Sequence, residues 1–252
     1  MKRLLVLCAA LFSSGSAMAA DLYIAPVPVA AQSAVSFFVE GRLGAALGMV
    51  DDLRFVNPIG TAFTTNATSG SNIILNGIDR NDEAWAGYVG AGAFVNENFF
   101  VRGSYRYFGE QDFTGSATFP GGTFNQDLKV YGHGLFVGLG GHVDLNDAVY
   151  LEGVLDIGVA MLRTEANQGA NLGRNNQFPG ESHFNLAGGV EVLAGYRMTD
   201  SVDLTLSASY HYLGSANTGT TGTPAPAGMQ VGERLEANLG AATVMAGLRF
   251  NF

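Results

Sequence analysis

The strongest constraint on the fold is an alternation of apolar and polar residues that recurs along the chain. Between residues 202 and 212, Val, Leu, Ala and Tyr alternate with Asp, Thr, Ser and His. Successive side chains of an extended strand point to opposite faces, so this pattern predicts a strand with one apolar and one polar face. Similar runs predict eight strands of about ten residues, the length that a transmembrane β-strand needs. They cover residues 37–49, 85–95, 99–107, 130–143, 149–159, 184–197, 202–212 and 235–252.

The predicted connections alternate between short and long. Residues 96–98, 144–147 and 198–201 form short turns, whereas 50–82, 109–127, 160–183 and 214–233 form long loops rich in Gly, Asn, Thr, Ser and Pro. Short periplasmic turns and longer extracellular loops are typical of outer-membrane barrels. The sequence therefore predicts an all-β fold, a closed eight-stranded antiparallel transmembrane β-barrel with four long extracellular loops and both termini in the periplasm.

The first residues predict export. Lys2 and Arg3 precede a short apolar segment, and Ala17-Met18-Ala19 gives a small-x-small cleavage pattern. We therefore predict a signal peptide over 1–19, a periplasmic leader over 20–34 and a barrel over 35–252, located in the outer membrane of a Gram-negative bacterium. Cys8 is the single cysteine and suggests a lipoprotein site, but it lies too early, within the apolar segment. The mature chain then has no disulfide.

The charge of the chain excludes several functions. Removing Lys2 and Arg3 changes the formal charge from −9 to −11. An acidic protein is a poor partner for nucleic acid. The sequence contains no Walker-type loop, CxxC, HExxH or GxSxG pattern. We expect no cofactor and no metal, since the four histidines at 133, 142, 183 and 211 lack metal-ligand spacing.

Charge also indicates which face of the barrel is inside. The apolar faces of seven well-phased strands carry no charge, and the opposite faces carry five acids and five arginines. A closed lumen requires such pairing, and the fixed fork of arginine suits it. No apolar run is long enough for a transmembrane helix. The predicted lumen charge network is Glu40, Arg42, Arg102, Arg106, Glu152, Asp156, Glu191, Arg197, Asp203 and Arg249.

Aromatic residues cluster at both ends of the apolar faces, which predicts two girdles at the membrane interfaces. A general preference of aromatics for strands would not explain this clustering. The girdle at the long-loop end contains Trp85, Tyr105, Tyr107, Phe184, Tyr210 and Tyr212, and that at the short-turn end contains Phe37, Phe99, Tyr196, Phe250 and Phe252. In the strand predicted for 130–143, we expect the face with Leu135, Val137 and Leu139 to meet the lipid. His133 lies on that same face.

Several short motifs resemble a known family in their order along the chain. They are "AADLYIAPVP", "FFVEGRLG", "WAGYVGAGAF", "VRGSYRYFG" and the terminal "LRFNF". The chain resembles small eight-stranded outer-membrane proteins with an OmpA-like or Opa-like barrel, in particular the surface antigens of alphaproteobacteria. The resemblance implies that Phe252 is an assembly signal. It also implies outer-membrane lipids, lipopolysaccharide, the barrel-assembly machinery, periplasmic chaperones and an unidentified host or surface ligand as partners.

Three functions compete at this point. Ser209, His211 and Glu191 could form a lipid hydrolase, but they face the lumen and the order lacks the His-x-Ser-Asn pattern of outer-membrane deacylases. A small porin-like channel is the second alternative, although eight strands leave an interior that side chains can fill. The favoured prediction is a non-catalytic barrel that supports the envelope and displays its loops for surface interactions.

Overall fold

The computed structural model describes residues 35–57, 71–74, 79–119, 122–170, 175–220 and 234–252. The predicted signal peptide 1–19 and leader 20–34 lie outside the described residues. Among the residues described, no helix is long and apolar enough to cross a membrane.

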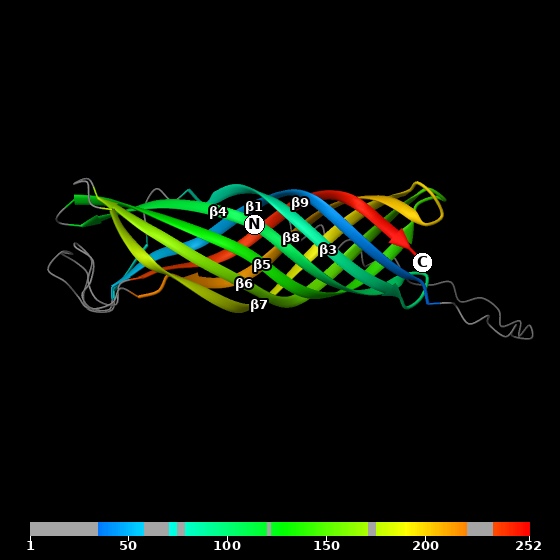
Figure 1. Cartoon of the computed structure of the whole chain (residues 1–252), viewed down its shortest axis with the longest axis horizontal. Helices are drawn as coiled ribbons and strands as arrows, with labels where there is room; N and C mark the ends of the chain where they lie inside the picture. Colours follow the sequence, from blue (N-terminus) through cyan, green and yellow to red (C-terminus); the bar gives the residue numbers. More distant parts are fainter. Residues whose placement is uncertain (1–34, 58–70, 75–78, 120–121, 171–174, 221–233) are drawn as a thin grey trace, which may run out of the picture. The chain divides into compact units, whose positions relative to one another are not determined.

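The described residues form one antiparallel sheet that closes on itself (Figure 1). Each strand of the ring pairs with its neighbours along the chain, and β1 pairs with β9 to complete it. The short strand β2 pairs only with the last residues of β1. The predicted eight-stranded ring is therefore confirmed. It consists of β1 (Phe37–Asn57), β3 (Asn81–Phe94), β4 (Phe99–Phe119), β5 (Gly122–Asp144), β6 (Val149–Ala170), β7 (Asn175–Arg197), β8 (Val202–Asn217) and β9 (Arg234–Asn251), and β2 is Ser71–Ile74.

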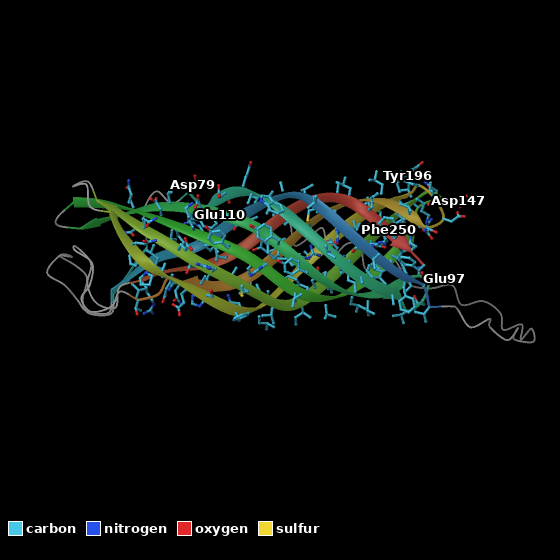
Figure 2. The ribbon with its side chains drawn as sticks, in the orientation of Figure 1. Asp79, Glu97, Glu110, Asp147, Tyr196 and Phe250 are labelled. Atoms are coloured by element: carbon cyan, nitrogen blue, oxygen red, sulfur yellow. The ribbon has the colours of Figure 1, made fainter. Side chains whose placement is uncertain are left out.

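Three short turns lie at one end of the barrel, together with the C-terminus. Figure 2 shows Glu97 and Asp147 of two of these turns at the same end as Phe250. Two turns share one device, because the side-chain oxygens of Asn96 and Asn146 each accept two backbone N–H bonds at 2.9 Å. Asparagine favours such turns by replacing a backbone acceptor. We call this end of the barrel the turn end.

The prediction of four long loops is wrong for much of their length. Residues 109–119 continue β4 and 122–127 belong to β5, while 160–170 and 175–183 belong to β6 and β7. The polar composition suggested loops. The residues there still alternate, but the apolar ones now point inward and the polar ones outward. Phe113 is buried while Asp112 and Thr114 are exposed. The strands therefore continue with their polar face outward.

Glycine bulges in β4 and β8 mark where the inward positions of these two strands change. The pairing of β4 with β5 shifts between Tyr107 and Gly109, and that of β8 with β9 shifts between Tyr212 and Gly214. Both glycines have positive φ, 83° at Gly109 and 94° at Gly214. One extra residue in a strand moves every later side chain to the other face. In β4 the inward positions change from even numbers to odd ones.

The bulges divide the ring into two parts of opposite polarity. The lower barrel runs from the turn end to the bulges, and the upper barrel lies beyond them. The upper barrel is apolar inside and polar outside, as in a soluble protein. Its core includes Phe108, Phe113, Leu128, Val130, Leu162, Phe178, Leu213 and Leu235. The lower barrel has the reverse arrangement, with exposed aliphatic side chains around the ring such as Leu43, Val89, Leu135, Leu155, Leu186 and Leu206.

The bulge at Gly109 requires a residue without a Cβ, which a substitution can test. A Cβ at Gly109 would collide with the Ala84 Cβ, would lie 2.7 Å from the Trp85 carbonyl oxygen, and would require a left-handed conformation. We expect Gly109→Ala to lower the free energy of unfolding by about 1–3 kcal/mol. Gly103→Ala is the matched control, because a Cβ there meets nothing within 4 Å. Urea unfolding in detergent micelles measures both, and equal midpoints would contradict the role given to Gly109.

Candidate functional site

The interior of the lower barrel holds most of the predicted charge network. Nine of the ten predicted residues are buried there, and Arg197 is the exception. They come from β1, β4, β6, β7, β8 and β9, so the cluster joins strands that are not neighbours in the ring. The nine are Glu40, Arg42, Arg102, Arg106, Glu152, Asp156, Glu191, Asp203 and Arg249.

Glu191 is the centre of this network. Its Oε1 accepts hydrogen bonds from Arg42 at 2.9 Å and from Arg102 at 2.7 Å, and its Oε2 accepts one from Arg106 at 2.7 Å. The side chains of Glu191, Arg42 and Arg102 have no exposed surface. A carboxylate without water needs all of its lone pairs satisfied. Three guanidinium groups supply those bonds from two other strands.

A second carboxylate, Asp156, holds the same arginines on another side. Arg102 donates to its Oδ2 at 3.0 Å and Arg106 donates at 2.9 Å. His211 Nε2 lies 3.2 Å from the same oxygen. Asp156 and Glu191 together therefore clamp two arginines of β4 against β6 and β7.

Nearer the turn end, Arg249 bridges two further carboxylates. It donates to Glu40 Oε2 at 3.0 Å and to both oxygens of Glu152 at 2.5 and 2.7 Å. The hydroxyl of Tyr88 donates to Glu40 at 2.5 Å. Paired N–H donation to one carboxylate is the strongest geometry that arginine offers. Arg249 on β9 is thereby tied to β1 and to β6 across the interior.

Aromatic rings fill the space between these charges. The Arg42 guanidinium lies 3.8 Å from the centre of the Tyr88 ring, and Arg249 lies 4.3 Å from that of Phe38. Such stacking satisfies the faces of a guanidinium that hydrogen bonds leave bare. Three inward aromatics each face a glycine on the paired strand, which leaves room for the ring. These pairs are Phe38 with Gly92, Phe100 with Gly140, and Tyr150 with Gly195.

Arg197 does not join the network, which corrects the predicted pairing at the rim. Its backbone does lie opposite Asp203, as the turn at 198–201 requires. Its side chain instead reaches Asp144 and donates to the Asp147 carbonyl at 3.1 Å. Asp203 accepts hydrogen bonds from Tyr150 at 2.9 Å and from Asn251 at 2.9 Å. As the last residue of β7, Arg197 can extend its long side chain outward over the turn.

In the structure, the acid beside the histidine of the hydrolase alternative is Asp156 and not Glu191. Ser209 Oγ lies 3.4 Å from His211 Nδ1, and the opposite ring nitrogen faces Asp156 rather than the predicted Glu191. The Ser209 hydroxyl lies closer to Thr243 Oγ1, at 2.7 Å. His211 is fully buried and packs against Phe108 and Phe136. The three groups have the order of a hydrolase triad but are enclosed by the barrel.

Two histidines adjoin the network; from the sequence, His211 had a role only in the hydrolase alternative and His142 had none. His142 Nδ1 lies 3.0 Å from Glu152, and His211 contacts Asp156. The nine buried residues comprise four arginines and five carboxylates. A proton on one of these imidazoles would balance the count. In the part of the chain that the structure describes, no group of three or more His, Cys, Asp or Glu could hold a metal ion.

The outer surface carries the predicted girdle residues. All eleven lie on the outer face, and ten of them are strongly exposed. Tyr107 is half-buried because it packs on Trp85, with ring centres 4.8 Å apart. His133 also faces outward, as the phase of 130–143 required, and contacts the Tyr105 hydroxyl at 3.2 Å.

Comparison with known proteins shows likeness of structure but not of sequence. No family model matches the chain, and no curated protein sequence matches it. Neisserial surface protein A is 15% identical, with 86% of this chain and 97% of that chain covered and a TM-score of 0.40. OprG from Pseudomonas aeruginosa is 14% identical over 86% and 96%, with a TM-score of 0.47. The protease OmpT from Escherichia coli is 12% identical over 86% and 97%, with a TM-score of 0.49.

The central position of Glu191 gives a prediction about stability. Glu191→Gln keeps the shape of the side chain but removes the charge shared by three buried arginines. We expect a loss of about 3–5 kcal/mol in the free energy of unfolding, the usual cost of breaking a buried ion pair. Glu97→Gln in an exposed turn is the control. Both are measured by urea unfolding in micelles, and equal stability of the two variants would refute the central role of Glu191.

Proposed function

We propose that the chain is a non-catalytic barrel of the Gram-negative outer membrane that supports the envelope and displays its upper barrel at the cell surface. The observation that carries this proposal is the inverted polarity of the lower barrel. Its outer face exposes large apolar side chains while its inner face buries charges with almost no exposed surface. Water would disfavour such a surface, whereas a bilayer requires it.

The closed backbone supports the same location. Every strand of the ring is hydrogen-bonded on both sides in the lower barrel, so no edge is left to lipid. Within hydrocarbon, only helices and closed barrels satisfy their backbone groups. Aromatic residues such as Trp85 and Tyr212 border the apolar band near the bulges, and Phe37 and Tyr196 border it near the turns. This arrangement fits the two interfaces of a membrane.

The filled interior favours a structural role over a channel. A solute would have to pass both the ion-paired cluster around Glu191 and the apolar core around Phe113. Opening the first costs the pairing of buried charges, and opening the second exposes apolar surface. The same enclosure supports a non-catalytic role, since a substrate would have to displace Phe108 or Phe136 to reach His211.

A prediction about insertion tests the membrane-facing surface. Val190 faces outward, is 53% exposed and pairs with Leu155 and Tyr210 in the apolar band. Val190→Arg places a charge in the bilayer and should cost about 2–4 kcal/mol of stability. Thr199→Arg in a turn is the control and should insert normally. Refolding into lipid vesicles, followed by the heat-dependent gel shift of folded barrels, measures both. Normal insertion of Val190→Arg would refute the assignment.

A second prediction concerns conductance. Purified protein in a planar lipid bilayer should show only small or rare current steps, because the charge cluster and the apolar core close the interior in series. The test compares wild type with a variant that loses two of the clamped arginines, Arg102→Ala with Arg106→Ala, which should also stay closed because the apolar core around Phe113 is untouched. Large and steady currents from the wild type would contradict this proposal and favour the alternative function of a small porin-like channel.

A further inference from the structure

A groove crosses the apolar outer face of the lower barrel. It has a volume of about 630 Å³ and a floor of small residues, Gly41, Ala91 and Gly103, between Val39, Tyr105 and Leu135. A Cβ at Gly103 would meet nothing within 4 Å, so this glycine creates the hollow rather than making room for a neighbour. Bare backbone here lowers the surface by the depth of a side chain.

A second hollow lies at the upper border of the apolar band, on β4, β5 and β6. It has a volume of about 440 Å³ and is lined by Tyr107, Tyr131, His133, Met161, Arg163 and Glu165. Tyr131 pairs across the ladder with Glu110, which Figure 2 labels on the upper barrel, far from the turn end. This pocket therefore lies where an outer-membrane barrel meets the headgroups of the outer leaflet.

The two hollows adjoin each other on the outer face. Tyr105 borders the groove, His133 borders the pocket, and the Tyr105 hydroxyl lies 3.2 Å from His133 Nδ1. The groove also climbs towards the pocket along one row of the ladder, from Gly41 to Leu135. Gly41 is four residues from the turn-side end of β1 at Phe37, whereas Leu135 is nine residues from that of β5 at Asp144.

The pocket carries side chains whose chemistry suits a sugar phosphate. The Arg163 side chain is 62% exposed and has one contact with Glu165 at 3.2 Å, which leaves guanidinium donors directed to solvent. Arginine forks match phosphate oxygens. Tyr107, Tyr131 and Met161 offer flat or apolar faces, and the tyrosine hydroxyls offer hydrogen bonds, which together suit a sugar ring.

The remaining cation nearby is already engaged. Lys129 lies on the upper barrel, beyond the apolar band, and donates to Glu110 at 3.1 Å and approaches Asp112 at 3.3 Å. Hydrogen bonds to Glu110 and Asp112 raise the pKa of Lys129 and keep it charged and paired. Among the described residues that line the pocket, Arg163 is the only guanidinium, and Glu165 contacts one of its nitrogens. The recognition of an anion therefore depends on Arg163.

We propose that this surface binds one molecule of lipid A, the phosphorylated glycolipid of the outer leaflet, with an acyl chain in the groove and a sugar phosphate at Arg163. The apolar groove and the polar pocket succeed each other in the order that a lipid spans the interface. A second copy of the chain would cover the groove but would gain nothing from the polar pocket. A phospholipid would use the phosphate contact but not the aromatic sugar site.

The chain offers matched variants for a test. Gly103→Leu fills the groove, and Gly153→Leu adds the same side chain at a glycine of β6 that is equally open, with nothing within 4 Å of its Cβ. Arg163→Gln removes the phosphate ligand. Arg234→Gln removes an arginine of β9 that pairs with Glu236, two residues away, just as Arg163 pairs with Glu165.

The full chain is refolded in detergent micelles with lipid A or, in a parallel arm, with phosphatidylglycerol. Free lipid is removed by size exclusion, and the bound lipid is counted by mass spectrometry. Folding of each variant is verified by the heat-dependent gel shift. We expect Gly103→Leu and Arg163→Gln to retain about tenfold less lipid A, the scale of one charge-assisted hydrogen bond or one filled acyl site. Gly153→Leu and Arg234→Gln should retain as much as wild type.

Three results would overturn the proposal. If all variants retained as much lipid A as wild type, the proposed site would be refuted. If wild type retained as much phosphatidylglycerol as lipid A, the proposed preference for a glycolipid would be refuted. A dimer that Gly103→Leu dissociates without any loss of lipid would assign the groove to a second copy. The experiment is independent of conductance, so its failure would leave the closed-barrel proposal standing.

Discussion

The ion pairing of Glu191 with three arginines sets the conditions for the rest of the lower barrel. In a bilayer, apolar side chains gain little by leaving lipid for protein, so the outer face contributes little to holding the strands together. Cohesion then comes from the backbone ladder and from the interior. Glu191, Asp156 and Arg249 each connect strands that are not adjacent in the ring. These cross-barrel bonds fix which side chains fit inside.

The upper barrel continues the same backbone ladder but has an apolar interior in place of a charged one. Beyond the bulges the outer face is polar, and the interior is held by apolar burial around Phe113 and Leu128. In β4 and β8 a one-residue bulge moves the later side chains to the opposite face at the cost of a single positive φ, and glycine adopts that conformation without strain. β5 and β6 keep their even positions inward throughout, and there the residue types change instead. One continuous sheet thus has one part with an apolar outer face and another with a polar outer face.

The alternation of residues was sufficient to predict the eight strands, their antiparallel order and the buried charges. It was insufficient at the strand ends, because a period of two looks the same in either phase, and polar residues beyond Gly109 were therefore taken for a loop. It also placed Arg197 inside by parity alone, although a long side chain beside a turn can reach the rim. The partnership of His211 with Asp156 depends on distances across the barrel, which no local pattern contains. The inward aromatics had a usable signal, since Tyr150 and Phe100 each face a glycine across the ladder.

The length of the β4–β5 hairpin has a consequence for what can touch this protein first. Twelve residues separate Tyr107, at the upper border of the apolar band, from Phe119 at the end of β4. At about 3.3 Å per residue and a tilt of about 40°, the strand rises roughly 30 Å above the apolar band. A segment held by a continuous ladder and a packed core keeps its height, whereas a loop of equal length would fold back. In the proposed outer-membrane setting, macromolecules that arrive from outside would therefore meet this projection first.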